Sequence, residues 1–209
     1  MSISAKEAFD RLVEGNGRFV SEVEGRRLAG QKKRSELIAA QEPFAIVLGC
    51  ADARVPAEIV FDQGIGDLFV IRVAGNIVAP SQVGSIEYAA ENFGVRLVVV
   101  LGHTNCGAVD ATLRELERPM ERRSPNLRSI VDRIRPSVEG LLEAGGCDDR
   151  DHLMKQAVRA NIRVSVDHLR HGSEVLETLI ARESLVVVGG EYAIETGEVE
   201  FFGELPAGW

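Results

Sequence analysis

The chain has 209 residues, of which 45% are hydrophobic and 27% charged, a balance typical of a globular protein with an apolar core. Its net charge of -8 at pH 7 argues against nonspecific binding to nucleic acid, which needs cationic surfaces. No apolar run approaches the ~20 residues that span a bilayer, and we expect no signal peptide. Three cysteines are too few for a disulfide framework, so we expect a cytoplasmic protein.

Two helices are expected before the first strand. Ser4 and Glu7 match a capping box, in which each side chain satisfies a backbone N–H of the first helical turn. Helical spacing continues with Ala8, Phe9, Leu12 and Val13. A second helical stretch covers residues 31–40 and ends before Pro43. Both helices are amphipathic and need a surface to pack on, and we expect a partner subunit to provide it.

From residue 44 onwards, short apolar runs alternate with helical patterns. The expected strands are residues 44–49, 67–73, 97–101 and 185–188, followed by a short strand at 199–202. The expected helices are residues 56–63, 80–93, 106–117, 126–144 and 151–171. This alternation predicts an α/β fold with a mainly parallel central sheet of four strands, a short C-terminal edge strand and helices on both faces. No repeat or linker is visible, so residues 1–209 are expected to form one domain.

Three residues of this pattern form a candidate zinc site: Cys50, His103 and Cys106. Two thiolates and one imidazole are typical zinc ligands, and a set of three leaves the fourth position open for water, as in catalytic sites. Cys50 follows the first predicted strand, His103 follows the third, and Cys106 lies one helical turn later. If these two strands are neighbours where the strand order reverses, the three side chains converge at the carboxyl edge of the sheet.

Asp52 and Arg54 lie beside the first cysteine and have two interpretations. They could form an ordinary exposed ion pair of little energetic value. Beside a metal, Arg54 would instead keep Asp52 ionised, so that Asp52 accepts a hydrogen bond from zinc-bound hydroxide. If Arg54 released it, Asp52 could bind the zinc and block it. Cys147 has no neighbouring His or Cys and is interpreted as a structural cysteine.

Three segments in order resemble the signature stretches of the β-class carbonic anhydrases. They are residues 50–55 (CADARV), 72–76 (RVAGN) and 103–107 (HTNCG). The resemblance extends from about residue 41 to residue 192. Ala53 departs from the family pattern, in which serine is common, but this removes no member of the proposed mechanism.

The resemblance implies a role for each candidate residue. Cys50, His103 and Cys106 would be the zinc ligands, and Asp52 and Arg54 the catalytic dyad. The substrate pocket would be formed by Gln41, Phe69, Val73, Tyr88 and the backbone N–H of Gly107. Of these, Gln41, Phe69 and Tyr88 match positions that line the pocket across a dimer interface. The family fold implies a homodimer, or two dimers paired into a tetramer.

The implied activity is the reversible, zinc-dependent hydration of carbon dioxide to bicarbonate and a proton, by hydroxide on zinc oriented by the Asp–Arg dyad. An alternative is a hydrolase of carbon disulfide or carbonyl sulfide on the same scaffold. A second alternative is a noncatalytic regulator that binds zinc or bicarbonate, which Asp52 and Arg54 argue against. A zinc nucleobase deaminase is poorly supported, because its H-x-E and P-C-x-x-C motifs are absent.

The sequence also resembles one subtype of the family more than another. Relatives that bicarbonate inhibits cooperatively bind it in a second pocket made of a tryptophan, an arginine and a tyrosine. The matching positions here are Val47, Arg72 and Tyr192, so the tryptophan is missing. Together with Gln41, this resembles the plant-like, unregulated subtype, and we expect an open site in which Arg54 holds Asp52 away from the metal.

Overall fold

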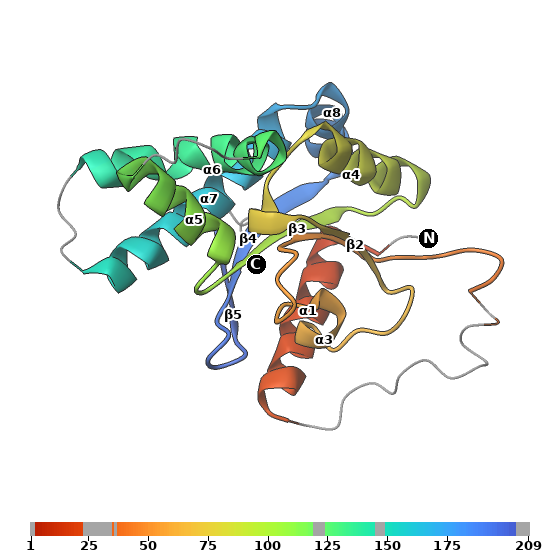
Figure 1. Cartoon of the computed structure of the whole chain (residues 1–209). Coiled ribbons are helices and arrows are strands. Elements are labelled where there is room, and N and C mark those ends of the chain that lie inside the picture. The colour runs from red at the N-terminus through yellow and green to blue at the C-terminus, as the bar shows by residue number, and fades with distance from the viewer. Residues whose placement is uncertain (1–2, 23–34, 36, 119–123, 145–148, 204–209) are drawn as a thin grey trace.

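The computed structural model describes residues 3–22, 35, 37–118, 124–144 and 149–203 (Figure 1). One five-stranded sheet runs in the order β2-β1-β3-β4-β5. The first four strands pair in parallel and β5 is antiparallel to β4, which confirms the predicted parallel sheet with a short edge strand. The strands are β1 (Ala45–Gly49), β2 (Leu68–Arg72), β3 (Leu97–His103), β4 (Val186–Tyr192) and β5 (Val199–Phe202).

Helices cover both faces of the sheet, as the alternating pattern predicted (Figure 1). On one face lie α4 (Pro80–Asn92) and α7 (Arg150–His171), with α5 (Gly107–Glu117), α6 (Pro125–Glu143) and α8 (Glu174–Glu183) packed around them. On the other face lie α1 (Ala5–Val20) and the single turn α3 (Ala57–Val60). Between these two layers the central strands β1 and β3 are completely buried, which explains why their sequences are almost wholly apolar.

The N-terminal helix begins as predicted. The Ser4 Oγ accepts a hydrogen bond from the backbone N–H of Glu7 at 3.1 Å. Phe9 and Leu12 are buried against this chain's own sheet, whereas Val13 is 44% exposed. The apolar stripe of α1 therefore finds a surface within its own subunit, and additional packing on a partner subunit stays a prediction.

Two predicted helices are shorter or different in the structure. For the stretch 31–40, residues 31–34 and 36 lie outside the described residues, and residues 37–40 form a turn and bend rather than a helix end. Ile38 is 84% exposed there, so its side chain does not anchor a helix on the rest of this chain. The helix predicted at 56–63 is reduced to α3, because Asp62 adopts a left-handed backbone (φ +47°) that ends it.

Near glycines, the ends of two strands also differ from the predicted ends, and one helix was not predicted. Strands β3 and β4 extend beyond their predicted ends to His103 and Tyr192. Glycine disfavours strands in sequence patterns, but Ile162 of α7 packs so closely on Gly102 and Gly189 that a Cβ at either position would clash. Helix α8 was not predicted from the sequence, although Ser173 caps it by accepting a hydrogen bond from the N–H of Leu176. Among the described residues, no helix combines the length and apolar character that crossing a membrane requires.

Candidate metal centre and active site

The three predicted metal ligands meet at the carboxyl edge of the sheet. Cys50 follows β1, His103 ends β3, and Cys106 immediately precedes α5. Strands β1 and β3 are neighbours, and the chain order reverses between them, as the prediction required. The candidate ligand atoms of the three residues lie within 4.8 Å of one another, and all three residues are buried.

The histidine is held in the form that can bind a metal. Its Nδ1 lies 2.8 Å from the carbonyl oxygen of Thr104, which can only accept, so Nδ1 carries the proton. The Nε2 is then left with a lone pair, and this buried atom has no hydrogen-bond partner among the described residues. A buried nitrogen without a partner beside two sulfur atoms fits a soft divalent cation such as zinc.

The two cysteines behave as a pair. Their Sγ atoms are 4.0 Å apart, and the Cys50 Sγ also accepts the backbone N–H of Gly75 at 3.3 Å. The hydrogen bond from Cys106 outweighs the effect of burial and lowers the pKa of Cys50 to about 4. The same hydrogen bond, together with burial, raises the pKa of the Cys106 thiol. The hydrogen bond between the two sulfur atoms therefore favours one thiolate paired with one thiol.

Asp52 and Arg54 form a bidentate ion pair at the edge of this cluster. The Arg54 Nε and Nη2 donate to the two carboxylate oxygens of Asp52 at 2.9 and 2.8 Å, and the Arg54 backbone N–H adds a third hydrogen bond at 3.0 Å. These bonds hold the pKa of Asp52 well below its usual range. The Asp52 Oδ2 lies 3.8 Å from the His103 Nε2, so an ionised acceptor stands next to the position that a cation would take.

Two further side chains, whose contacts were not predicted from the sequence, hold the segments that carry the candidate ligands. Arg72 donates to the carbonyl oxygens of Cys50 and Asp52 at 3.0 and 2.5 Å. Glu195 accepts hydrogen bonds from Thr104 and Asn105, the two residues between the second and third ligands, at 2.9 and 3.0 Å. Glu195 is 90 residues away in sequence and carries no motif, so no local signal could have identified it.

The predicted pocket residues separate into two groups. Val73 and Gly107 lie at the ligand cluster: Val73 exchanges backbone hydrogen bonds with Gly49 and Ala51, and Gly107 opens α5 next to Cys106. Gln41 precedes β1, so the strand separates it from Cys50 by ~16 Å at ~3.3 Å per residue.

Gln41 and Tyr88 line a hollow of about 720 Å³ at the amino end of β1. Tyr88 is 52% exposed and its ring lies 6.3 Å from that of Phe69 on β2. One chain therefore does not bring Gln41 and Tyr88 to the metal ligands. Their predicted role across a dimer interface needs a second copy.

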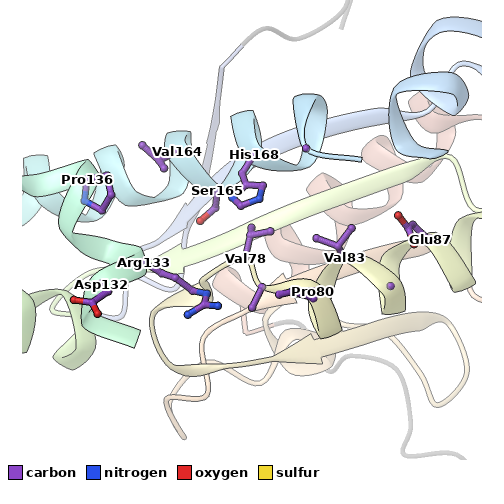
Figure 2. A pocket seen from close by; sticks show the side chains of 13 residues that line it. Val78, Pro80, Val83, Glu87, Asp132, Arg133, Pro136, Val164, Ser165 and His168 are labelled. Atoms are coloured by element: carbon purple, nitrogen blue, oxygen red, sulfur yellow. The ribbon is translucent and has the colours of Figure 1, made fainter. Parts of the chain in front are cut away.

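Another hollow lies between α4, α6 and α7 and is separate from the ligand cluster. Its volume is about 700 Å³, and Figure 2 shows Val78, Pro80, Val83, Arg133, Ser165 and His168 around it. No candidate metal ligand lines it. His168 also lines this hollow.

Comparisons with known proteins agree with this geometry. A protein-family profile described as carbonic anhydrase matches residues 45–199. The chain is 39% identical to a carbonic anhydrase of Mycolicibacterium smegmatis, over 95% of this chain and 93% of the relative. It is 38% identical to carbonic anhydrase 2 of Mycobacterium tuberculosis, over 91% and 89% of the two chains.

Solved structures resemble the fold as well. The β-carbonic anhydrase CcaA superimposes with a TM-score of 0.74 at 26% identity, covering 93% of this chain and 95% of the other. A tetrameric β-carbonic anhydrase from Sordaria macrospora has a TM-score of 0.70 at 24% identity, covering 81% and 85%. The family match, the close relatives and the shared fold lead to one conclusion: this chain belongs to the β-class carbonic anhydrase family.

Proposed function

We propose that this protein catalyses the reversible hydration of carbon dioxide to bicarbonate and a proton. The observation that carries the proposal is the buried cluster of Cys50, His103 and Cys106, with an unpartnered imidazole nitrogen next to the Asp52–Arg54 pair. These three residues would hold one zinc ion. Zinc held there would act as a Lewis acid that makes hydroxide available as a nucleophile near neutral pH.

The residues around the cluster have separate roles in this proposal. Asp52, kept ionised by Arg54, can only accept hydrogen bonds, so it would orient the attacking oxygen through that oxygen's proton. The backbone N–H of Gly107, at the start of α5, would donate to a substrate oxygen. Val73 would supply apolar surface for carbon dioxide, which is uncharged and is not bound through an ion pair.

A complete substrate pocket would require two copies of the chain. Gln41, Phe69 and Tyr88 would come from the second copy, since Gln41 and Tyr88 lie apart from the ligands of their own chain. We therefore propose a homodimer, which could pair into a tetramer like the tetrameric relative from Sordaria macrospora. We also propose that the protein is cytoplasmic.

We further propose the open-site, plant-like subtype. The pairing of Asp52 with Arg54 supports it, because a carboxylate held by two guanidinium hydrogen bonds is not free to occupy the metal. Val47 is fully buried within β1, where it has neither the bulk nor the N–H of a tryptophan. Activity measured against bicarbonate concentration should show simple product inhibition, whereas a steep sigmoidal loss would contradict this subtype.

The central experiment combines metal analysis with stopped-flow hydration of carbon dioxide. We expect about one zinc per chain and rapid hydration that disappears when the metal is removed. Carbon disulfide and carbonyl sulfide should be tested in parallel, because faster turnover of either would favour the hydrolase alternative. Bound zinc without turnover of any of the three would indicate a noncatalytic regulator and contradict the proposal.

A further inference from the structure

A backbone turn after β2 touches the Cys50 sulfur. Gly75, in the short 3-10 turn η1 (Ala74–Asn76), donates its N–H to the Cys50 Sγ at 3.3 Å. Gly75 has a left-handed backbone (φ +70°), and a Cβ there would lie 2.7 Å from the Ile134 Cδ1 and 3.1 Å from the Ala108 Cβ. The turn therefore requires glycine for its conformation and for the space between α5 and α6.

Two buried side chains of α7 hold this turn from the opposite side. The Asn161 Nδ2 donates to the Gly75 carbonyl oxygen at 2.8 Å, and the Ser165 Oγ donates to the Asn76 carbonyl oxygen at 3.2 Å. Asn161 is 2% exposed and Ser165 4% exposed. They lie one turn apart on α7, so each satisfies one of two consecutive carbonyl groups of η1. Of the two, only Asn161 holds the residue whose N–H contacts the Cys50 sulfur.

We propose that Asn161 is a positioning residue for the metal site, acting on the sulfur of Cys50 through the backbone of Gly75. By fixing the carbonyl side of Gly75, Asn161 keeps the N–H of the same residue directed at the sulfur. A hydrogen bond to a thiolate is charge-assisted, and it draws electron density from the sulfur while fixing its direction. Mutation of a residue that orients a metal ligand in this way typically lowers metal affinity or activity by 10- to 100-fold. This inference rests on the proposed zinc site.

The test compares Asn161→Ala with Ser165→Ala in the full-length protein. Each variant removes one buried donor from one carbonyl of the same turn, so a purely structural role would affect both alike. The first readout is zinc affinity, measured by competition with a chelator. The second is the thiolate-to-metal charge-transfer band of the cobalt(II)-substituted protein, which reports the electron density on sulfur. Circular dichroism checks that each variant is folded.

For Asn161→Ala we expect at least tenfold weaker zinc binding. We also expect the charge-transfer band to move to longer wavelength, because loss of the hydrogen bond raises the energy of the sulfur lone pairs. Ser165→Ala should keep the wild-type band position. Equal effects of the two variants on both readouts, or an unchanged band in a folded Asn161→Ala protein, would overturn the inference. If Asn161→Ala does not fold, Asn161→Leu, which retains more of the volume, takes its place under the same criteria.

The wild-type protein separates this inference from the proposed function. If it binds no zinc and gives no thiolate charge-transfer band with cobalt, the zinc site itself is wrong. If it binds zinc and hydrates carbon dioxide while the two variants behave alike, only the role of Asn161 is wrong.

Discussion

Cys106 is a candidate metal ligand and also the residue that immediately precedes α5. Its sulfur faces Cys50 at 4.0 Å, and it is 1% exposed. Since its buried thiol has a raised pKa, it becomes a good ligand only when a cation supplies compensating charge. A substitution of Cys106 is therefore a direct test of the metal site.

Replacing Cys106 with serine should remove zinc and hydration activity together, because serine does not supply a soft thiolate. Metal analysis and stopped-flow kinetics on the same sample would measure both losses. Cys147→Ser is the control and should leave the zinc content unchanged; Cys147 lies outside the described residues. A Cys106→Ser protein with full zinc and full rate would show that the ligand assignment is wrong.

Changing Asp52 to asparagine should preserve the fold and the zinc but lower the hydration rate by about 10- to 100-fold. The amide carries a donor group and no charge, so it cannot act as the pure acceptor that the mechanism needs. Arg54→Ala should also slow the reaction by releasing Asp52. Wild-type kinetics in both variants would make the pair an ordinary surface ion pair.

The Asp52–Arg54 interaction should also depend on pH in a defined direction. Arg54 lowers the folded-state pKa of Asp52 below the unfolded value of about 3.9. The stabilisation is therefore fully present above that pH and is lost as pH falls through the folded pKa. A double-mutant cycle of Asp52→Asn and Arg54→Ala, measured by urea unfolding, should give a coupling energy below about 1 kcal/mol at pH 7. It should decrease below pH ~4; a coupling that grows on acidification would contradict this account.

The second half of helix α1 is hydrogen-bonded to two other parts of the fold. Asn16 donates to the carbonyl oxygens of Val60 and Gly197 at 3.1 and 2.8 Å, and its Oδ1 accepts the N–H of Val199. One buried side chain thus joins α1 to α3 and to the β4–β5 hairpin. The neighbouring Gly15 permits this contact, because a Cβ there would lie only 1.9 Å from the Phe61 carbonyl oxygen.

Two glycines of α1 should therefore respond to alanine with opposite signs. Gly15→Ala should lower the free energy of unfolding by about 1–3 kcal/mol, because the new methyl group overlaps the backbone of Phe61. Gly17→Ala should raise it by about 0.5–1 kcal/mol, since nothing lies within 4 Å and alanine favours the helix. Urea unfolding of both variants measures the difference. Equal destabilisation by the two substitutions would contradict the close approach of α1 and α3.

At the scale of the whole molecule, the separation of Gln41 from Cys50 has a consequence for the assembly. A pocket that contains both needs two chains, and each of its halves should then be replaceable separately. Mutations in the two halves should complement each other when they lie on different chains. A pocket built within one chain would not permit this.

We predict that mixing a Cys106→Ser chain with a Gln41→Ala chain restores activity. In the mixed dimer, the intact metal site of one chain faces the intact Gln41 of the other. The two inactive or slow proteins should be unfolded together, refolded with zinc, and compared with each protein refolded alone. Light scattering should show a dimer or tetramer. Absence of restoration in proven mixed dimers would place Gln41 outside the partner's site.

Local sequence patterns predicted most of the elements and the candidate metal ligands. Apolar runs such as residues 44–49 predicted buried strands, and the ligands were recognisable because they follow strands in a family-like order. The helix at 174–183 was detectable from its Ser173 cap and was overlooked. The ends of β3 and β4 were not predictable, because Gly102 and Gly189 are favoured only by the approach of Ile162.

Only the tertiary structure decided how the site is supported. Asn161 reaches Gly75 across 86 residues, and Glu195 reaches Asn105 across 90. Such contacts depend on how α7 and the β4–β5 hairpin pack on the sheet, and single polar side chains in these segments carry no periodic signal. The sequence by itself therefore determined which residues are the candidate metal ligands. The packed fold determined which ring nitrogen of His103 carries its proton, which backbone group contacts the Cys50 sulfur, and which predicted pocket residues lie apart from the candidate ligands of their own chain.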